Sequence, residues 1–269
     1  MKKNANVLSI AYFTFILLIL FSGSLRGIAA EVVYFLAFIC PIFAVILFTD
    51  RELPKMREFS LPRDSKMLFL PTVFPLIFLI AALSFLTSWF ISLFGATPAP
   101  VDLGGGLLFA LFYNAVLPSI LEELLFRYLP MRYLAPDSPT YAVIFSALFF
   151  ALAHHSFFSM PYAFLAGAAF MTVNIICQSA LPSVILHFLN NAISILWMFF
   201  FAEKLSPLVF LTLLLVPAII SVVFLIKLRG RFAGRFSVLF EKKERFYFTP
   251  LMLLATLASV VVAILEILT

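Results

Sequence analysis

The sequence predicts an all-α fold, a polytopic transmembrane helical bundle of eight or nine spans, and three observations carry that prediction. Of the 269 residues, 64% are hydrophobic and 12% charged, with a mean hydropathy of +1.14, whereas soluble domains average roughly 45–50% apolar and about 25% charged residues. Several apolar runs reach the roughly 20 residues that a helix needs to cross the hydrocarbon core. These runs lack the alternation of apolar and polar residues typical of membrane β-barrels.

The predicted spans follow the apolar runs between charged or proline-containing interruptions. The first two lie before the charged segment that begins at Asp50, and the third follows a basic segment that ends at Lys66. Four more are separated by short polar interruptions, and two of these spans could be divided differently around Pro161 and Pro182. The last two flank the basic segment that begins at Lys227. The resulting spans are 7–25, 31–49, 67–94, 104–128, 140–155, 158–180, 182–202, 206–226 and 247–267.

The distribution of Lys and Arg predicts the orientation. Basic residues concentrate in the segments 51–66 and 227–245, while 95–103 has none. Nine spans place both basic segments in the cytoplasm by the positive-inside rule, together with Lys2 and Lys3. The expected location is therefore the cell membrane, as a multi-pass protein with cytoplasmic basic loops. Lipid headgroups account for the net charge of +5, so membrane lipids are expected as partners and nucleic acid is not.

The N-terminus and the cysteines give two smaller expectations. A secretory signal ending at Ala29-Ala30 is an alternative, but the run is long for a signal core and Ile28 fits the cleavage site poorly, so a retained first span is expected. Cys40 and Cys177 lie in apolar runs, outside any CxxC or zinc-ligand spacing, and we expect both to be reduced and buried.

The segment 119–130 carries charged side chains inside an apolar run, namely Glu122, Glu123 and Arg127. An ionisable group near mid-membrane costs on the order of 2.5–3.5 kcal/mol on insertion scales, so such groups usually face a cavity and serve a function. Glu123 and Arg127 are spaced i,i+4 and would form an ion pair on one helical face, which needs no further function. Glu122 lies about 100° around the helix from Glu123 and is left without that partner.

All three histidines lie in the next polar interruptions of the chain. His187 and Asn191 are spaced i,i+4, so an imidazole and an amide share one helical face. There they could donate hydrogen bonds to one small group, or serve only as a polar clamp between helices. His154 and His155 end an earlier run, and for His155 we expect only a hydrogen bond to a neighbouring helix or a place at the water interface.

Together these residues place a carboxylate on one span, a histidine on a second, and a histidine with an amide on a third. Peptide hydrolysis needs such a set: a base that activates water, an imidazole that positions water or binds a metal, and donors for the oxyanion. The sequence contains neither GxSxG nor HExxH. A covalent serine mechanism and a standard zincin are therefore disfavoured.

Depth in the membrane tests this grouping. With a rise of about 1.5 Å per residue, a fourth helix ending near residue 128 would leave Glu122 about 9 Å from the cytoplasmic side and His154 about 21 Å from it. A helix that continues to about residue 134 brings Glu122 to about 18 Å, where the two side chains can meet. We therefore predict that Pro130 bends this helix without ending it, and that Tyr128 to Tyr133 remain helical.

Three motifs in this part of the chain resemble those of a known family, the type II CAAX prenyl endopeptidases and their bacterial relatives. The group is also called the CAAX protease and bacteriocin-processing (CPBP) or Abi family of intramembrane proteases. The resemblance covers roughly residues 118 to 195. The motifs are EExxxR at Glu122, Glu123 and Arg127, FxxxH at Phe150 and His154, and Hxxx(N/D) at His187 and Asn191.

The resemblance implies a catalytic role for four of these residues. Glu122 and His154 would activate the attacking water, and His187 and Asn191 would stabilise the oxyanion, with Glu123 and Arg127 in support. The family is labelled metalloprotease, so zinc is the cofactor to consider, with Glu122, His154 and His187 as its ligands. The same three residues could instead form a metal-free water site, and we favour glutamate-dependent chemistry.

The expected organisation is one membrane domain over 1–269, with N-terminal spans over 1–100, a CPBP catalytic core over 104–200 and C-terminal spans over 206–269. The expected function is an intramembrane endopeptidase that acts on a membrane-associated peptide, prenylated and of CAAX type in some relatives. The 35 phenylalanines would accept a lipidated peptide, although aromatic side chains more often serve packing. The alternative is a non-catalytic membrane scaffold or bacteriocin-immunity protein; a transporter is disfavoured because no inverted repeat is visible.

Overall fold

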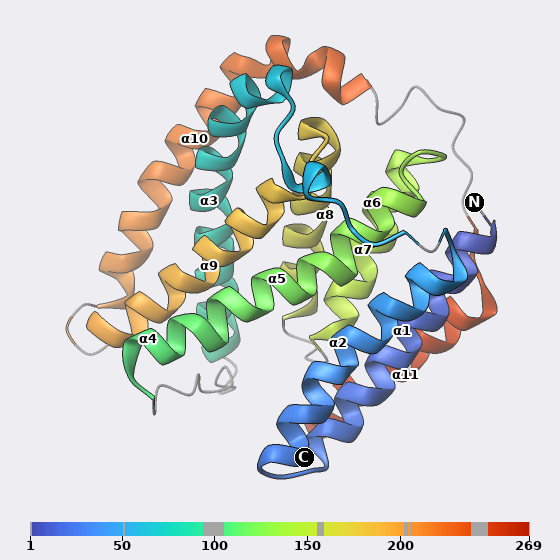
Figure 1. The fold of residues 1–269 in the computed structure, drawn as a ribbon. Helices are drawn as coiled ribbons and strands as arrows, with labels where there is room; N and C mark the ends of the chain where they lie inside the picture. The colour runs from blue at the N-terminus through green and yellow to red at the C-terminus, as the bar shows by residue number, and fades with distance from the viewer. Residues whose placement is uncertain are drawn as a thin grey trace.

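The computed structural model describes residues 2–50, 52–93, 105–154, 159–201, 204, 206–237 and 247–268. These residues form a bundle of helices and contain no β-strand (Figure 1), so the predicted all-α class is confirmed. Each of the nine predicted apolar runs coincides with a helix. The helices are α1 (Lys2–Gly23), α2 (Ile28–Phe48), α3 (Arg63–Ser92), a composite helix over Gly106–Tyr133, α7 (Pro139–Ala153), α8 (Met160–Cys177), α9 (Leu181–Phe200), α10 (Pro207–Phe236) and α11 (Pro250–Leu268), with a short 3-10 helix, η1 (Met56–Phe59), before α3.

Not every helix is long enough to cross a membrane unaided. Six helices in the described part of the chain have the required length and hydropathy, whereas α7 and the apolar stretches 211–227 of α10 and 250–261 of α11 are shorter. The protein is therefore a polytopic membrane bundle, and the predicted count of eight or nine spans stays a prediction. The helix α7 is nevertheless buried among its neighbours, since it packs against α8, the composite helix and α11.

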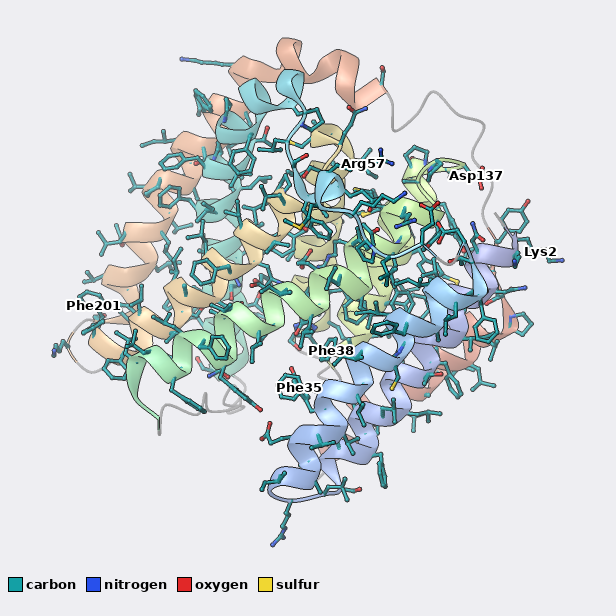
Figure 2. The ribbon with its side chains drawn as sticks, in the orientation of Figure 1. Lys2, Phe35, Phe38, Arg57, Asp137 and Phe201 are labelled. Carbon is teal, nitrogen blue, oxygen red and sulfur yellow. The ribbon has the colours of Figure 1, made fainter. Side chains whose placement is uncertain are left out.

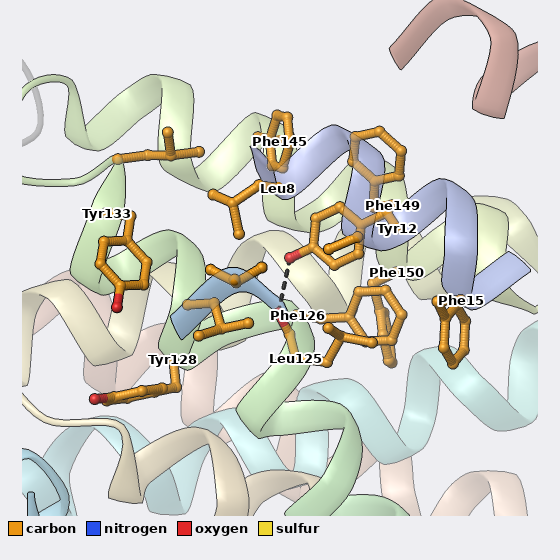
Figure 3. Packing of buried hydrophobic residues seen from close by; sticks show 14 of the residues in the cluster. Leu8, Tyr12, Phe15, Leu125, Phe126, Tyr128, Tyr133, Phe145, Phe149 and Phe150 are labelled. Carbon is orange, nitrogen blue, oxygen red and sulfur yellow. Dashed lines mark hydrogen bonds between the residues drawn. The ribbon is translucent and has the colours of Figure 1, made fainter. Parts of the chain in front are cut away.

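The bundle has two groups of helices joined by the composite helix. In Figure 1, α1 packs against α2 and α11 on one side, and α3 packs against α10 on the other. The composite helix crosses between them and contacts α2, α7, α8 and α9. The largest core cluster lies where α1 meets the composite helix and α7 (Figure 3). There the ring of Tyr12 stacks on Phe126 and Phe149, with centroids 5.3 and 4.7 Å apart.

One end of the bundle gathers the chain segments that carry the basic residues. Asn4 Nδ2 donates to the carbonyl of Tyr133, and the Ala180 N–H donates to the carbonyl of Glu58, so the N-terminus and the segment before α3 lie at this end. Lys2, Arg57 and Asp137 lie there in Figure 2, whereas Phe201 lies at the opposite end. The N-terminus and the first basic segment therefore lie at the same end of the bundle. Which side of the membrane this end faces stays a prediction.

A small polar cluster joins α2 to the composite helix at this basic end. Arg132 Nη2 lies 2.8 Å from Asp50 Oδ2, and the Tyr133 hydroxyl donates to Asp50 Oδ1 over 2.8 Å. Partial desolvation acts to raise the pKa of Asp50, but the hydrogen bonds from the Glu52 N–H, Tyr133 and Arg132 outweigh it and lower the pKa. The carboxylate is therefore held ionised and fixes the C-terminal end of the composite helix.

The composite helix continues past Pro130 to Tyr133, as predicted. It consists of α4 (Gly106–Leu111), η2 (Phe112–Val116), α5 (Leu117–Glu123), η3 (Leu124–Tyr128) and α6 (Leu129–Tyr133), in which η2 and η3 are π-helical turns. A proline follows each of them, Pro118 after η2 and Pro130 after η3. Because proline has no N–H and crowds the carbonyl four residues earlier, the wider π turns let the helix continue through both prolines.

The two prolines release backbone carbonyls that other helices satisfy. Asn114 and Phe126 lie four residues before Pro118 and Pro130, so no residue donates to their carbonyls in the usual α-helical way. The Asn114 carbonyl accepts from Asn191 Nδ2 over 3.1 Å, and the Phe126 carbonyl accepts from the Ser146 hydroxyl over 2.5 Å. In the membrane, where water cannot replace these bonds, they fix α9 and α7 against the composite helix.

Beside these, the Tyr12 hydroxyl of α1 donates to the Leu125 carbonyl over 2.8 Å (Figure 3). This bond connects α1 to the second π turn.

The two cysteines differ from each other: Cys177 is buried, as predicted, but Cys40 is exposed. The prediction for Cys40 was wrong because it lies on the outer face of α2, where a small apolar thiol is compatible with lipid.

We expect Ser146→Ala to destabilise the protein by about 1–3 kcal/mol, because a buried carbonyl loses its donor. In the Pro130→Ala background the same change should cost less, because the new N–H at position 130 can bond the Phe126 carbonyl. Unfolding in mixed micelles, run as a double-mutant cycle, measures both effects. Ser194→Ala is the control, since Ser194 bonds only within its own helix. Equal costs in both backgrounds would contradict the role assigned to Pro130.

Candidate active site

A cavity of about 400 Å³ lies between the composite helix and its neighbours. It brings together all four residues predicted to be catalytic, from α5, the C-terminal end of α7, and α9. It also reaches the α1–α2 turn, at the end of the bundle opposite the basic segments (Figure 1). The lining residues are Ser22, Ala30, Glu31, Tyr34, Tyr113, Asn114, Pro118, Glu122, His154, His187 and Asn191.

The two adjacent glutamates occupy different environments, as their helical angles predicted. Glu122 lines the cavity with its side chain 19% exposed, and its Oε2 lies 3.8 Å from His187 Nε2. Glu123 is buried, with its side chain 1% exposed, and it does not line the cavity. Glu122 is thus the carboxylate that a water molecule or a peptide in the cavity can reach.

Glu123 forms the predicted ion pair with Arg127, and it also holds His187. Its Oε1 lies 3.0 Å from Arg127 Nη1 and 2.9 Å from His187 Nδ1. The predicted ion pair between Glu123 and Arg127 is thus confirmed. The bond to His187 was missed, because sequence spacing gives no information on contacts between separate helices.

Arg127 is fully buried and lies between aromatic rings. Its guanidinium carbon is 3.6 Å from the ring centroid of Phe150 and 5.3 Å from that of Phe170. Gly167 of α8 allows a close approach to α7 beside this stack, since a Cβ there would lie 3.1 Å from Ala147 Cα and 3.3 Å from Phe150 Cδ1. The rings and the Glu123 carboxylate together compensate part of the cost of burying the charge.

His187 is oriented by this carboxylate. An ionised carboxylate only accepts hydrogen bonds, so Nδ1 carries the proton that it donates to Glu123 Oε1. The other nitrogen, Nε2, is then turned toward Glu122 and the cavity. This is the arrangement by which a second carboxylate fixes the tautomer and ring position of a functional histidine.

His154 is oriented in the same way by a backbone carbonyl. It caps α7, and its Nδ1 donates to the Phe150 carbonyl over 2.8 Å. Because a carbonyl cannot donate, Nε2 of the neutral ring keeps its lone pair for the cavity. Both histidines therefore have Nδ1 occupied and Nε2 available.

The ring of Phe150 separates the two histidines and the arginine. It makes edge contacts with His154 and His187, with centroids 4.7 and 5.8 Å apart, while Arg127 covers its face. Sequence reasoning assigned Phe150 no role beyond the motif, because phenylalanine is common throughout the chain. Its position explains why an aromatic residue four positions before His154 suits this site.

Asn191 is held by its neighbours on two sides. Its Nδ2 donates to the carbonyl of Asn114, which Pro118 has released, and its Oδ1 accepts from Asn190 Nδ2 over 3.2 Å. An amide nitrogen has two hydrogens, so one remains for a ligand in the cavity. Thus Pro118, itself a lining residue, positions Asn191 through the backbone.

Sequence reasoning missed the part of the cavity formed by the first two helices and the first π turn. Glu31 and Tyr34 of α2 line it, and the Tyr113 hydroxyl donates to Glu31 Oε2. Glu31 was the available signal, an ionisable residue at the start of an apolar run, but a carboxylate in a first helical turn is common. His155 lies outside the described residues.

The donor set was tested for a metal site. The free Nε2 atoms of His154 and His187, with Nδ1 held by a carbonyl and a carboxylate, suit metal ligation. However, in the part of the chain that the structure describes, no three His, Cys, Asp or Glu side chains are placed to hold a metal ion. Glu122, His154 and His187 thus do not form a zinc site as they stand, and no reaction step below depends on one.

Comparison with known proteins identifies the central segment. Residues 104–193 match the family model described as type II CAAX prenyl endopeptidase Rce1-like. The match contains Glu122, His154, His187 and Asn191, and it leaves out the first three helices and the last two. No curated protein and no solved structure matches the chain.

The burial of the two glutamates predicts effects on stability that differ in size. Glu123→Ala should destabilise the protein by about 3–5 kcal/mol, because it leaves the buried Arg127 charge unpaired. Glu122→Ala, one position earlier and lining the cavity, should change stability by less than about 1 kcal/mol. Thermal unfolding in detergent measures both. Similar losses for the two variants would contradict the separate roles assigned to the glutamates.

Proposed function

We propose that the protein is an intramembrane endopeptidase, because residues 104–193 match the family model described as type II CAAX prenyl endopeptidase Rce1-like. It hydrolyses a peptide bond of a membrane-associated substrate with water activated by Glu122 and His154. The observation that carries the proposal is that residues from three separate motifs line one cavity. Prenylated peptides of the CAAX type are one candidate substrate, taken from the family description.

In the proposed reaction Glu122 is the general base. Its carboxylate takes a proton from a water molecule, and the hydroxide attacks the carbonyl carbon of the scissile peptide bond. His154 orients the same water, because its Nε2 can accept a hydrogen bond while Nδ1 stays on the Phe150 carbonyl. The proton held by Glu122 then passes to the leaving nitrogen, the C–N bond breaks, and a carboxylic acid and an amine result.

His187 and Asn191 are proposed to stabilise the oxyanion of the tetrahedral intermediate. The free hydrogen of Asn191 Nδ2 donates to it, and the protonated form of His187 donates from Nε2 while Nδ1 remains on Glu123. Glu123 and Arg127 act as positioning residues for His187. Their role is supported by the contacts of Glu123 Oε1, which lies within 3.0 Å of both partners.

Removal of the base or its partner should abolish cleavage in a folded protein. Glu122→Gln and His154→Ala are each expected to lower the rate by about 10²–10⁴-fold, the usual contribution of general acid–base catalysis. Because the substrate is not specified, membrane peptides of cells that carry the wild type are compared by mass spectrometry with those of cells that carry each variant. Glu52→Gln, an exposed carboxylate at the basic end, is the control.

Peptides that accumulate or disappear equally with wild type and Glu122→Gln would overturn the enzymatic proposal. If Glu122→Gln also keeps the biological activity and partner binding, the protein acts as a scaffold or immunity protein that uses the cavity to bind.

Whether activity requires zinc can be tested with a chelator and by metal analysis. Since the described side chains form no three-ligand metal site, activity of the purified protein should survive a zinc chelator, and metal analysis should find less than one zinc per chain. Loss of activity that added zinc restores would contradict the metal-free mechanism and assign Glu122, His154 and His187 as ligands.

A further inference from the structure

Glu31 is an ionisable residue of the cavity to which the proposed reaction gives no task. It lies in the first turn of α2, is exposed, and lines the same cavity as Glu122. Tyr113, on the first π turn of the composite helix, donates its hydroxyl to Glu31 Oε2. The carboxylate therefore lies where α2 faces the composite helix, near the α1–α2 turn.

Stabilisation of α2 accounts for a carboxylate in this turn but not for its direction. The N-terminus of α2 has no side-chain cap, and an acidic residue in the first turn favours the helix dipole on any face. Glu31 lies on the face that also carries Tyr34, three residues later, and both line the cavity. Its hydrogen-bond partner, Tyr113, lies on another helix. The position thus suits a role in the cavity as well as a role in α2.

The charged side chains in the described lining of the cavity are all acidic. The lining contains the carboxylates of Glu31 and Glu122 and no Lys or Arg. Arg127 is buried behind Phe150 and paired with Glu123. Arg26 in the α1–α2 turn is exposed and does not line the cavity, and the described parts of the basic segments lie at the opposite end of the bundle (Figure 1). A cleft with charges of one sign and apolar walls attracts ligands of the other sign and repels those of its own.

We infer that Glu31 is a specificity-determining residue that selects substrates with a cationic group close to the scissile bond. The group is a Lys or Arg side chain or a free amine. It pairs with the Glu31 carboxylate, while Glu122 activates the water. The inference rests on the proposed function, because it assigns a substrate class to the same cavity. A substrate with a carboxylate in place of this cationic group is disfavoured.

The test uses acylated peptide probes that are identical except for one residue, Lys, Gln or Glu, moved in turn through every position. Purified protein in lipid nanodiscs should cleave the best Lys probe at least about tenfold faster than its Glu counterpart, and added salt should reduce the difference. Glu31→Gln should remove most of the preference, and Glu31→Lys should reverse it. No preference in the wild type, or an unchanged preference in Glu31→Gln, would overturn the inference.

Two control variants separate charge from structure. Glu52→Gln removes an exposed carboxylate at the other end of the bundle and should keep the preference. Tyr113→Phe breaks the hydrogen bond to Glu31 but leaves its charge, so the preference should also remain. A loss in Tyr113→Phe as large as that in Glu31→Gln would mean that Glu31 acts as a tether between helices, against the inference.

Binding of non-cleavable probes separates this inference from the proposed function. Probes with a reduced peptide bond cannot be hydrolysed, so their affinities report charge selection alone. A Lys preference in binding without cleavage of any ordinary probe would contradict the endopeptidase proposal and support the role of Glu31. Cleavage without charge preference in rate or binding would contradict the role of Glu31 and support the endopeptidase.

Discussion

The buried carboxylate of Glu123 is the interaction on which the site depends. It joins the composite helix to α9 through His187, and Arg127 extends the contact to the rings of Phe150 on α7 and Phe170 on α8. A lone charge at this depth would be unstable, so each partner requires the other. The cost of burying the pair fixes the relative positions of four helices, and the His187 ring with them.

The prolines of the composite helix also fix the positions of neighbouring helices, through backbone carbonyls. Each proline removes an α-helical hydrogen bond and follows a π turn, and the carbonyl that lacks its usual donor accepts from a side chain on another helix. One such carbonyl holds Asn191, so the proposed oxyanion donor is placed by a backbone irregularity on the helix that carries the proposed base. Pro118 thus interrupts the backbone hydrogen bonds of this helix and also lines the cavity.

Much of this arrangement follows from the sequence, because charge and proline are rare in apolar runs and therefore informative. The helical angles of Glu122 and Glu123 predicted that the two side chains have different surroundings, and Glu122 lines the cavity whereas Glu123 is buried in an ion pair. The depth argument predicted that the helix continues past Pro130. The contacts of His187 with Glu123, of Phe150 with both histidines, and of Glu31 with the cavity could not be predicted. They depend on which face of each helix turns inward, and a helix that is apolar on all sides does not encode that. The phenylalanines that suggested a lipid-binding lining are absent from the described lining of the cavity. Some pack in the core, and others, such as Phe43 and Phe201, are exposed on the surface of the bundle.

The released carbonyls also affect how the protein is made. When residues 106–133 enter the bilayer, the carbonyls of Asn114 and Phe126 lack the α-helical donor that Pro118 and Pro130 remove, and the side chains that bond them, Asn191 and Ser146, have yet to be synthesised. Until α7 and α9 arrive, the nascent chain exposes polar backbone to lipid, which is costly. A chain that ends before α9 keeps the Asn114 carbonyl without its side-chain donor.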